Sequence, residues 1–259
     1  MFTITTNEIV QLVQMWLWPF FRVAGLLMTA PVIGTRTVPV RVRLVMAVLI
    51  TAILFPVIPE IKTNVNPVSA EGILITVKQI MIGVSMGLSM RVVFIALEMA
   101  GQAIGQLMGL MMATMVDPNN GNQVPIIGQF YLLLATLLFI AIDGHLIMIS
   151  VLAESFNSMP VSTTGMSSES AWEIVLWAGT ILKTAVVIAL PAIVSLLIVN
   201  LSFGVMTRSA PQLNIFAVGF PIMIILGVLI IFFNLSSFVP HMMEMFDGGA
   251  LMMQKVVTP

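Results

Sequence analysis

Residues 101–125 read GQAIGQLMGLMMATMVDPNNGNQVP and place a polar turn in the middle of an otherwise apolar chain. Glycines stand four residues apart at Gly101, Gly105 and Gly109, which leaves one face of a helix without side chains, so a neighbouring backbone can approach it closely. Pro118 ends this helix, because a proline ring fixes its own backbone and disfavours helical geometry in the residue before it. We therefore expect a grooved helix that leads into a turn.

Methionines overlap the last turn of this predicted helix at spacings of three and four residues. If the helix continues, they form one flexible apolar stripe on its surface. These residues are Met108, Met111, Met112 and Met115. Two interpretations fit the stripe: the methionines fill irregular gaps between helices, or they form a deformable seal inside a pore. The stripe considered alone favours gap filling, which is the usual role of methionine in apolar packing.

Composition places the chain in a membrane or inside an assembly of membrane proteins. Of its 259 residues, 59% are hydrophobic and only 8% are charged, and the mean hydropathy is +1.11. A soluble domain of this size needs a more strongly charged surface. The net charge of -1 and the lack of a basic cluster argue against nucleic acid as a partner. The absence of cysteine excludes disulfides and thiolate chemistry.

Six apolar stretches predict an all-α protein built from kinked helical hairpins. Most of them approach or exceed the roughly 20 residues that span a bilayer, although the second is short. The stretches cover about residues 9–33, 44–58, 72–97, 126–152, 174–206 and 213–239. The first connector holds Arg36, Arg41 and Arg43, so the positive-inside rule predicts that it faces the cytoplasm and that the N-terminus lies outside.

Charged residues within these stretches indicate that the helices do not simply face lipid. They are Arg22, Lys78, Arg91, Asp143 and Lys183. A charge near the centre of a spanning helix costs about 2.5 to 3.5 kcal/mol on insertion scales. Together with prolines inside the stretches, this cost predicts kinked hairpins that pack against other proteins or line a wet cavity.

The sequence carries little that favours an enzyme. Asp143-Gly144-His145 is the one place where a carboxylate and an imidazole come close in sequence, and residues two apart on a helix point to different faces. A buried turn with satisfied polar groups is the preferred interpretation of this tripeptide. No nucleophile, metal or dinucleotide fingerprint appears, so we expect neither enzymatic activity nor a cofactor.

A polar linker between the last two apolar stretches, residues 204–221, reads GVMTRSAPQLNIFAVGFP. It fits either a cytoplasmic turn with one positive-inside arginine or a segment that pairs with a neighbouring subunit. We expect Arg208, Pro211, Gln212 and Asn214 to hold such an assembly together. The linker resembles the R-x-A-P-Q-x-N-x-F-x-V-G-x-P signature of the FliR family, which belongs to the type III secretion export gate. RVAGLLMTAPVIGTRTVPVRVR at 22–43, and GLMMATMVDP followed by IDGHLIMI, are similar to two further signatures of that family.

This resemblance implies one subunit of a helical assembly with FliP-like and FliQ-like partners and an FlhB-like subunit. The assembly would lie in the bacterial inner membrane, at the flagellar basal body, and would export unfolded flagellar proteins. Residues 1–160 would form FliP-like hairpins and residues 161–259 a FliQ-like helix pair, within a single export-gate domain. The family's hairpins are raised largely out of the bilayer plane, although membrane lipid remains a partner.

By the same resemblance, residues 107–118 correspond to a plug loop that projects into the closed channel. This correspondence shifts the preferred interpretation of the methionine stripe from gap filling to a seal, hinged by the glycines and by Pro118. The alternatives are the equivalent subunit of a virulence injectisome and a small-solute secondary transporter that uses Asp143 and Lys183. The transporter predicts an internal repeat with paired broken helices, which the sequence does not show.

Overall fold

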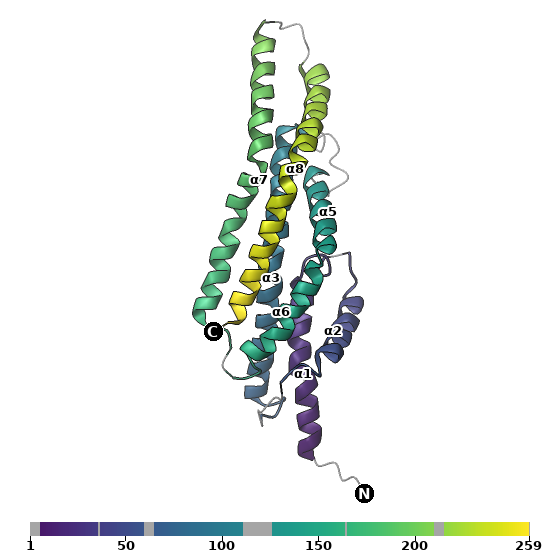
Figure 1. The fold of residues 1–259 in the computed structure, drawn as a ribbon, viewed down its shortest axis with the longest axis vertical. Coiled ribbons are helices and arrows are strands. Elements are labelled where there is room, and N and C mark those ends of the chain that lie inside the picture. Colours follow the sequence, from purple (N-terminus) through teal and green to yellow (C-terminus); the bar gives the residue numbers. More distant parts are fainter. Residues whose placement is uncertain are drawn as a thin grey trace. The chain divides into compact units, whose positions relative to one another are not determined.

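The computed structural model describes residues 6–35, 37–59, 65–110, 126–163, 165–209 and 215–258. Within these ranges the chain forms seven α-helices and no strand, which confirms the predicted all-α class (Figure 1). The helices are α1 (Thr6–Thr29), α2 (Val40–Leu54), α3 (Ala70–Leu107), α5 (Ile126–Ala141), α6 (Gly144–Ser158), α7 (Ser168–Ser209) and α8 (Ile215–Val257).

Serine side chains cap the N-termini of two of the long helices. The amide of Gly72 donates to Ser69 Oγ at 3.1 Å, and the amide of Ser170 donates to Ser167 Oγ at 3.0 Å. Each bond satisfies one of the amides that have no partner in the first turn of a helix. Glu71 and Glu169 follow in the first turns of α3 and α7, where the helix dipole favours a negative charge.

The residues divide into two compact units that share four helices. Unit 1 contains residues 1–93, 139–178 and 246–259, and unit 2 contains residues 94–138 and 179–245. Helices α3, α5, α7 and α8 therefore each contribute residues to both units.

Glycines bring α1 and α3 into direct backbone contact in unit 1. A Cβ atom added to Gly83 would lie 2.0 Å from the carbonyl oxygen of Arg22, and one added to Gly25 would lie 2.7 Å from that of Ile80. The Thr29 hydroxyl donates to the Val84 carbonyl at 3.2 Å. This is the packing that small residues at spacings of four permit between membrane helices.

Unit 2 buries small and large side chains on facing strips of α7 and α8. The buried positions on α7 are Ala185, Ala189, Ala192 and Leu196, and those on α8 include Met223, Ile231, Phe238 and Met242. Tyr131 of α5 packs edge to face against Phe238, with an angle of 69° between the ring planes and 4.6 Å between the ring centroids. This arrangement adds aromatic stabilisation to the burial of apolar surface.

The prediction of six spanning stretches is wrong in number. In the described residues three helices are long and apolar enough to cross a membrane, namely α3, α7 and Gly219–Val257 of α8, or up to four if the bent pair α5 and α6 is one span. Helix α2 has 15 residues, and at 1.5 Å per residue it reaches about 22 Å, short of a bilayer core of about 30 Å. Helix α1 is not among the candidate spans. The prediction that successive connectors lie on opposite sides of the membrane depended on six spans. It therefore no longer follows.

Candidate gate segment and buried arginine

The glycine face of α3 meets the start of α5 within unit 2. A Cβ atom added to Gly101 would lie 2.7 Å from the carbonyl oxygen of Ile127 and 2.8 Å from the Cα of Gly128. At Gly105 the same atom would meet the Ile127 side chain at 3.4 Å, an ordinary contact. The expected close approach of a neighbouring backbone thus occurs at Gly101, and Gly105 contributes only side-chain packing.

A tight turn follows α3 and fixes the start of the proposed plug segment. The helix ends at Leu107, and Gly109 adopts a φ of 78°, a left-handed conformation that favours glycine. Met108 is fully buried, and its side chain fills the space that a Cβ on Gly227 of α8 would occupy. Helix α3 therefore ends before Met108, earlier than the end at Pro118 that the sequence predicted.

The remaining residues expected to act as a gate lie outside the described residues. They are Met111, Met112, Met115 and Pro118. The same holds for Pro211, Gln212 and Asn214 of the proposed assembly segment, whereas Arg208 is exposed in the last turn of α7. The roles of all these residues stay predictions.

The strongest polar cluster that the sequence interpretation missed surrounds Arg22 in unit 1. This side chain is fully buried, and its guanidinium donates to Gln79 Oε1 at 2.8 Å, to the Ser155 carbonyl at 2.8 Å and to the Met159 carbonyl at 2.8 Å. The guanidinium carbon also lies 4.3 Å from the centre of the Phe156 ring. One side chain therefore ties α1 to α3 and to the end of α6.

The electrostatics of this cluster rest on carbonyl dipoles, because every acceptor of Arg22 is neutral. The C-terminal end of a helix carries a partial negative charge and unpaired carbonyls, and Arg22 meets both at the end of α6. Burial lowers the pKa of Arg22 to about 9, so the guanidinium still carries its charge at neutral pH. We expected charges in the apolar stretches to need partners. For Arg22, backbone oxygens are such partners.

The other charges in the apolar stretches have different surroundings. Lys78 donates to the Thr163 carbonyl, so a second cation binds the connection that follows α6. Lys183 is exposed on α7, and Arg91 is partly exposed on α3. A sequence signal did exist for the cluster in unit 1, since Lys78 and Gln79 form a polar pair within an apolar stretch. Nothing in the sequence pointed to the carbonyls of Ser155 and Met159, which are acceptors only because α6 ends there.

The Asp143-Gly144-His145 sequence forms a break between α5 and α6. Asp143 adopts a φ of 55° and is exposed, and Gly144 fits against the Phe139 ring, which a Cβ atom would approach to 2.4 Å. The turn predicted here is present. Its polar groups are not all satisfied, because His145 Nδ1 is buried without a hydrogen-bond partner in the described part of the chain. The described residues also bring no three potential metal-binding side chains together.

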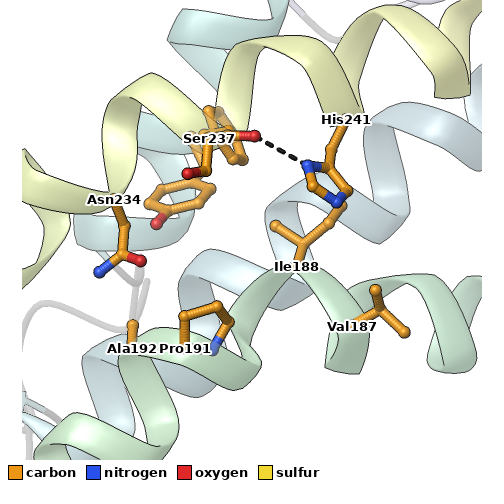
Figure 2. A pocket seen from close by; sticks show the side chains of 9 residues that line it. Val187, Ile188, Pro191, Ala192, Asn234, Ser237 and His241 are labelled. Atoms are coloured by element: carbon orange, nitrogen blue, oxygen red, sulfur yellow. Dashed lines mark hydrogen bonds between the residues drawn. The ribbon is translucent and has the colours of Figure 1, made fainter.

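A small hollow with a largely apolar lining and a few polar side chains lies between α5, α7 and α8 in unit 2 (Figure 2). Its volume is about 60 Å³. Pro191 and Val187 of α7 face Asn234, Ser237 and His241 of α8 across it. The remaining lining residues are Tyr131, Ile188, Ala192 and Phe238. The sequence interpretation assigned His241 no partner and did not detect this site.

The fold and the site together define an all-helical protein of the membrane whose buried polar groups hold helices and connections in place. The family model described as "Bacterial export proteins, family 1" matches residues 13–249. The chain is 39% identical over 230 residues to the flagellar biosynthetic protein FliR of Pectobacterium carotovorum subsp. carotovorum, covering 88% of this chain and 87% of that protein. It is 34% identical over 229 residues to FliR of Escherichia coli K12, with coverages of 88% and 87%.

The chain belongs to the FliR family of bacterial flagellar export proteins, as the three sequence signatures predicted. A more distant relative, FliR of Bacillus subtilis 168, is 28% identical over 233 residues. With its long apolar helices, the chain is a membrane-embedded component of flagellar biosynthesis. All the relatives named here are flagellar proteins, so they favour export over transport of a small solute.

Proposed function

We propose that this chain is a subunit of the flagellar export gate and forms, with FliP-like and FliQ-like subunits, a channel for unfolded flagellar proteins. An FlhB-like subunit is a further partner, and the assembly lies in the inner membrane within the flagellar basal body. Residues 107–118 act as a plug that seals the closed channel. Family membership supports the export role, and the geometry at the end of α3 supports the plug.

The observation that carries the plug is that both ends of segment 110–125 are held at one place in unit 2. Gly101 of α3 lies against the backbone of Ile127 and Gly128, where α5 begins. Met108 is buried against Gly227, and Gly109 turns the chain beside the Phe220 ring, 3.2 Å from where its Cβ would lie. The described residues on both sides of the proposed plug are thus held by packing, which supports a plug that is anchored at its ends.

The sealing mechanism follows from the chemistry of the side chains at the tip. A pore that admits an unfolded chain must be wide when open, and a dry apolar constriction holds back ions by excluding water. Met111, Met112 and Met115 have unbranched thioether side chains that can pack on one another and then repack around a passing polypeptide. Met108 has a different task in this scheme, since its burial makes it the anchor of the loop.

Large apolar faces on the last two helices support an assembly with partner subunits. Only 17% of the most apolar stretch of α7 and 22% of that of α8 is buried, against 61% for α3. We assign residues 161–259, which include α7 and α8, to a FliQ-like hairpin, and residues 1–160 to FliP-like hairpins. Arg208 with Pro211, Gln212 and Asn214 would join this hairpin to a neighbouring subunit.

The plug can be tested by placing charge in the proposed seal. Replacing Met112 and Met115 with Asp hydrates an apolar constriction, so we expect an ion leak, measured as single-channel conductance or as loss of the proton gradient. The matched control replaces both residues with Leu, which keeps the seal apolar. A fully assembled Asp variant that stays as ion-tight as the parent would show that the methionines only fill gaps.

A further inference from the structure

Polar residues form one stripe along the otherwise apolar helix α8. Asn234, Ser237, His241 and Glu244 stand at spacings of three, four and three residues, so they share one face of the helix. A polar stripe on a helix long enough to span a membrane faces either protein or a wet cavity, because lipid cannot satisfy its hydrogen bonds. The hollow in Figure 2 lies beside this stripe.

Among the described residues, two that line the hollow have a hydrogen-bond acceptor without a helical or side-chain donor. Pro191 has no amide N–H, so the carbonyl of Val187 lacks the helical donor that it would otherwise have. Asn234 uses its Nδ2 to donate to the Ile230 carbonyl at 2.7 Å, so its Oδ1 is the atom left to accept. At about 60 Å³ the hollow has room for ordered water, since one water molecule needs about 10 to 15 Å³ of such space.

His241 is oriented so that one of its nitrogens can take up a proton. Its Nδ1 lies 2.8 Å from the carbonyl oxygen of Ser237. Figure 2 marks this hydrogen bond with a dashed line. A carbonyl only accepts, so Nδ1 must carry the hydrogen, and Nε2 then holds the free lone pair of the neutral ring. A backbone carbonyl that fixes a histidine in this way is the usual means of selecting its tautomer.

The groups around His241 that carry or can carry charge come from three helices. Lys183 precedes Val187 by one turn of α7, Glu244 follows His241 by one turn of α8, and Tyr131 of α5 lines the hollow. Lys183, Glu244 and the His241 side chain itself are exposed.

We propose that this hollow is a hydrated proton-binding site, in which ordered water contacts His241 Nε2. A proton passes from hydronium to the Nε2 lone pair, so an O–H bond breaks, an N–H bond forms and water remains. The imidazolium then donates from both nitrogens, to the Ser237 carbonyl and, through water, to the acceptors on the α7 side. The site is independent of the plug, since its residues lie on other segments.

Hydration can be measured with a water-soluble, membrane-impermeant thiol reagent, because the chain has no cysteine of its own. In the assembled complex in lipid nanodiscs, Ser237→Cys should react about tenfold faster than Val186→Cys, an exposed apolar position of α7, since thiol reactivity follows water access. Asn234→Cys serves as a second probe of the hollow. If both probes react as slowly as Val186→Cys, the hollow is dry and the proposal fails.

Proton binding can be measured by nitrogen NMR of complex labelled at histidine, with His145→Gln to assign the two histidines. We expect the neutral His241 ring to carry its hydrogen on Nδ1. A hydrogen on Nε2 in the neutral ring would overturn the proposal.

Discussion

Arg22 shows how a single charge is accommodated in the apolar interior of unit 1. Its partners are Gln79 and the carbonyls at the end of α6, so removing the guanidinium leaves several buried acceptors without a donor. A buried acceptor that loses its hydrogen-bond donor typically costs about 1 to 3 kcal/mol. Arg22→Met keeps the apolar stem of the side chain, and we expect it to lower the melting temperature and the yield of the purified complex.

Two control variants define what the Arg22 result means. Lys183→Met removes an exposed charge and should leave the melting temperature unchanged. Arg22→Lys keeps the charge but cannot reach three acceptors at once, because a lysine lacks the planar fork of arginine, so it should recover only part of the stability. A melting temperature of Arg22→Met equal to that of the parent would mean that the cluster does not stabilise unit 1.

Gly109 is the second residue whose backbone decides a local structure. With a φ of 78°, a side chain there costs about 1 to 2 kcal/mol, and a Cβ would also press on the Phe220 ring. We expect Gly109→Ala to loosen the base of the plug loop and to give a measurable ion leak. Gly179→Ala is the matched control, since nothing lies within 4 Å of its added Cβ, and an equal leak in both variants would exclude a role for the turn.

At the scale of helices, the contact between α3 and α5 depends on one glycine more than on the other. A Cβ on Gly101 would force apart two backbones, whereas a Cβ on Gly105 makes an ordinary contact. Gly101→Ala should therefore reduce thermal stability and the resistance of segment 110–125 to protease, and Gly105→Ala should be tolerated. Equal behaviour of the two variants would show that α5 can shift to accept the methyl group.

The helices themselves were largely predictable from the sequence, because long apolar runs bounded by glycine, proline and serine define their positions. The break at Asp143 was not placed between two helices, since it lies inside a continuous apolar run and depends on a left-handed residue. The spacing of Gly101, Gly105 and Gly109 predicted a groove but could not rank the three positions. That ranking depends on where α5 approaches, which only the packed structure shows.

The surroundings of some site residues follow from the local sequence, whereas those of others depend on residues far away in the chain. The helix was predicted to end at Pro118, whereas α3 ends at Leu107 with a left-handed Gly109, and the predicted turn after Pro118 lies outside the described residues. The partners of Arg22 lie 57 and 133 residues away along the chain, so no local pattern could identify them. The polar stripe on α8 was readable from its spacing, and its significance depended on the neighbouring proline of α7.

At the scale of the whole chain, exposed apolar surface predicts dependence on partners. Apolar side chains on α7 and α8 remain half or more exposed, among them Leu182, Ile198, Leu201, Ile225, Phe232 and Phe233. A contiguous apolar surface of this kind marks an interface with protein or lipid. Lipid alone does not suit Lys183, which would bring a charge into an apolar environment.

Co-expression tests this dependence. Expressed alone and purified in detergent, the chain should aggregate or degrade, whereas expression together with FliP-like and FliQ-like subunits should give a single monodisperse species that contains it. The measurement is size-exclusion chromatography with light scattering, and the control adds the partners after purification to separate assembly during synthesis from later binding. If the solitary chain is a stable monomer in detergent, its exposed helices need only lipid, and the proposed assembly loses its main structural support.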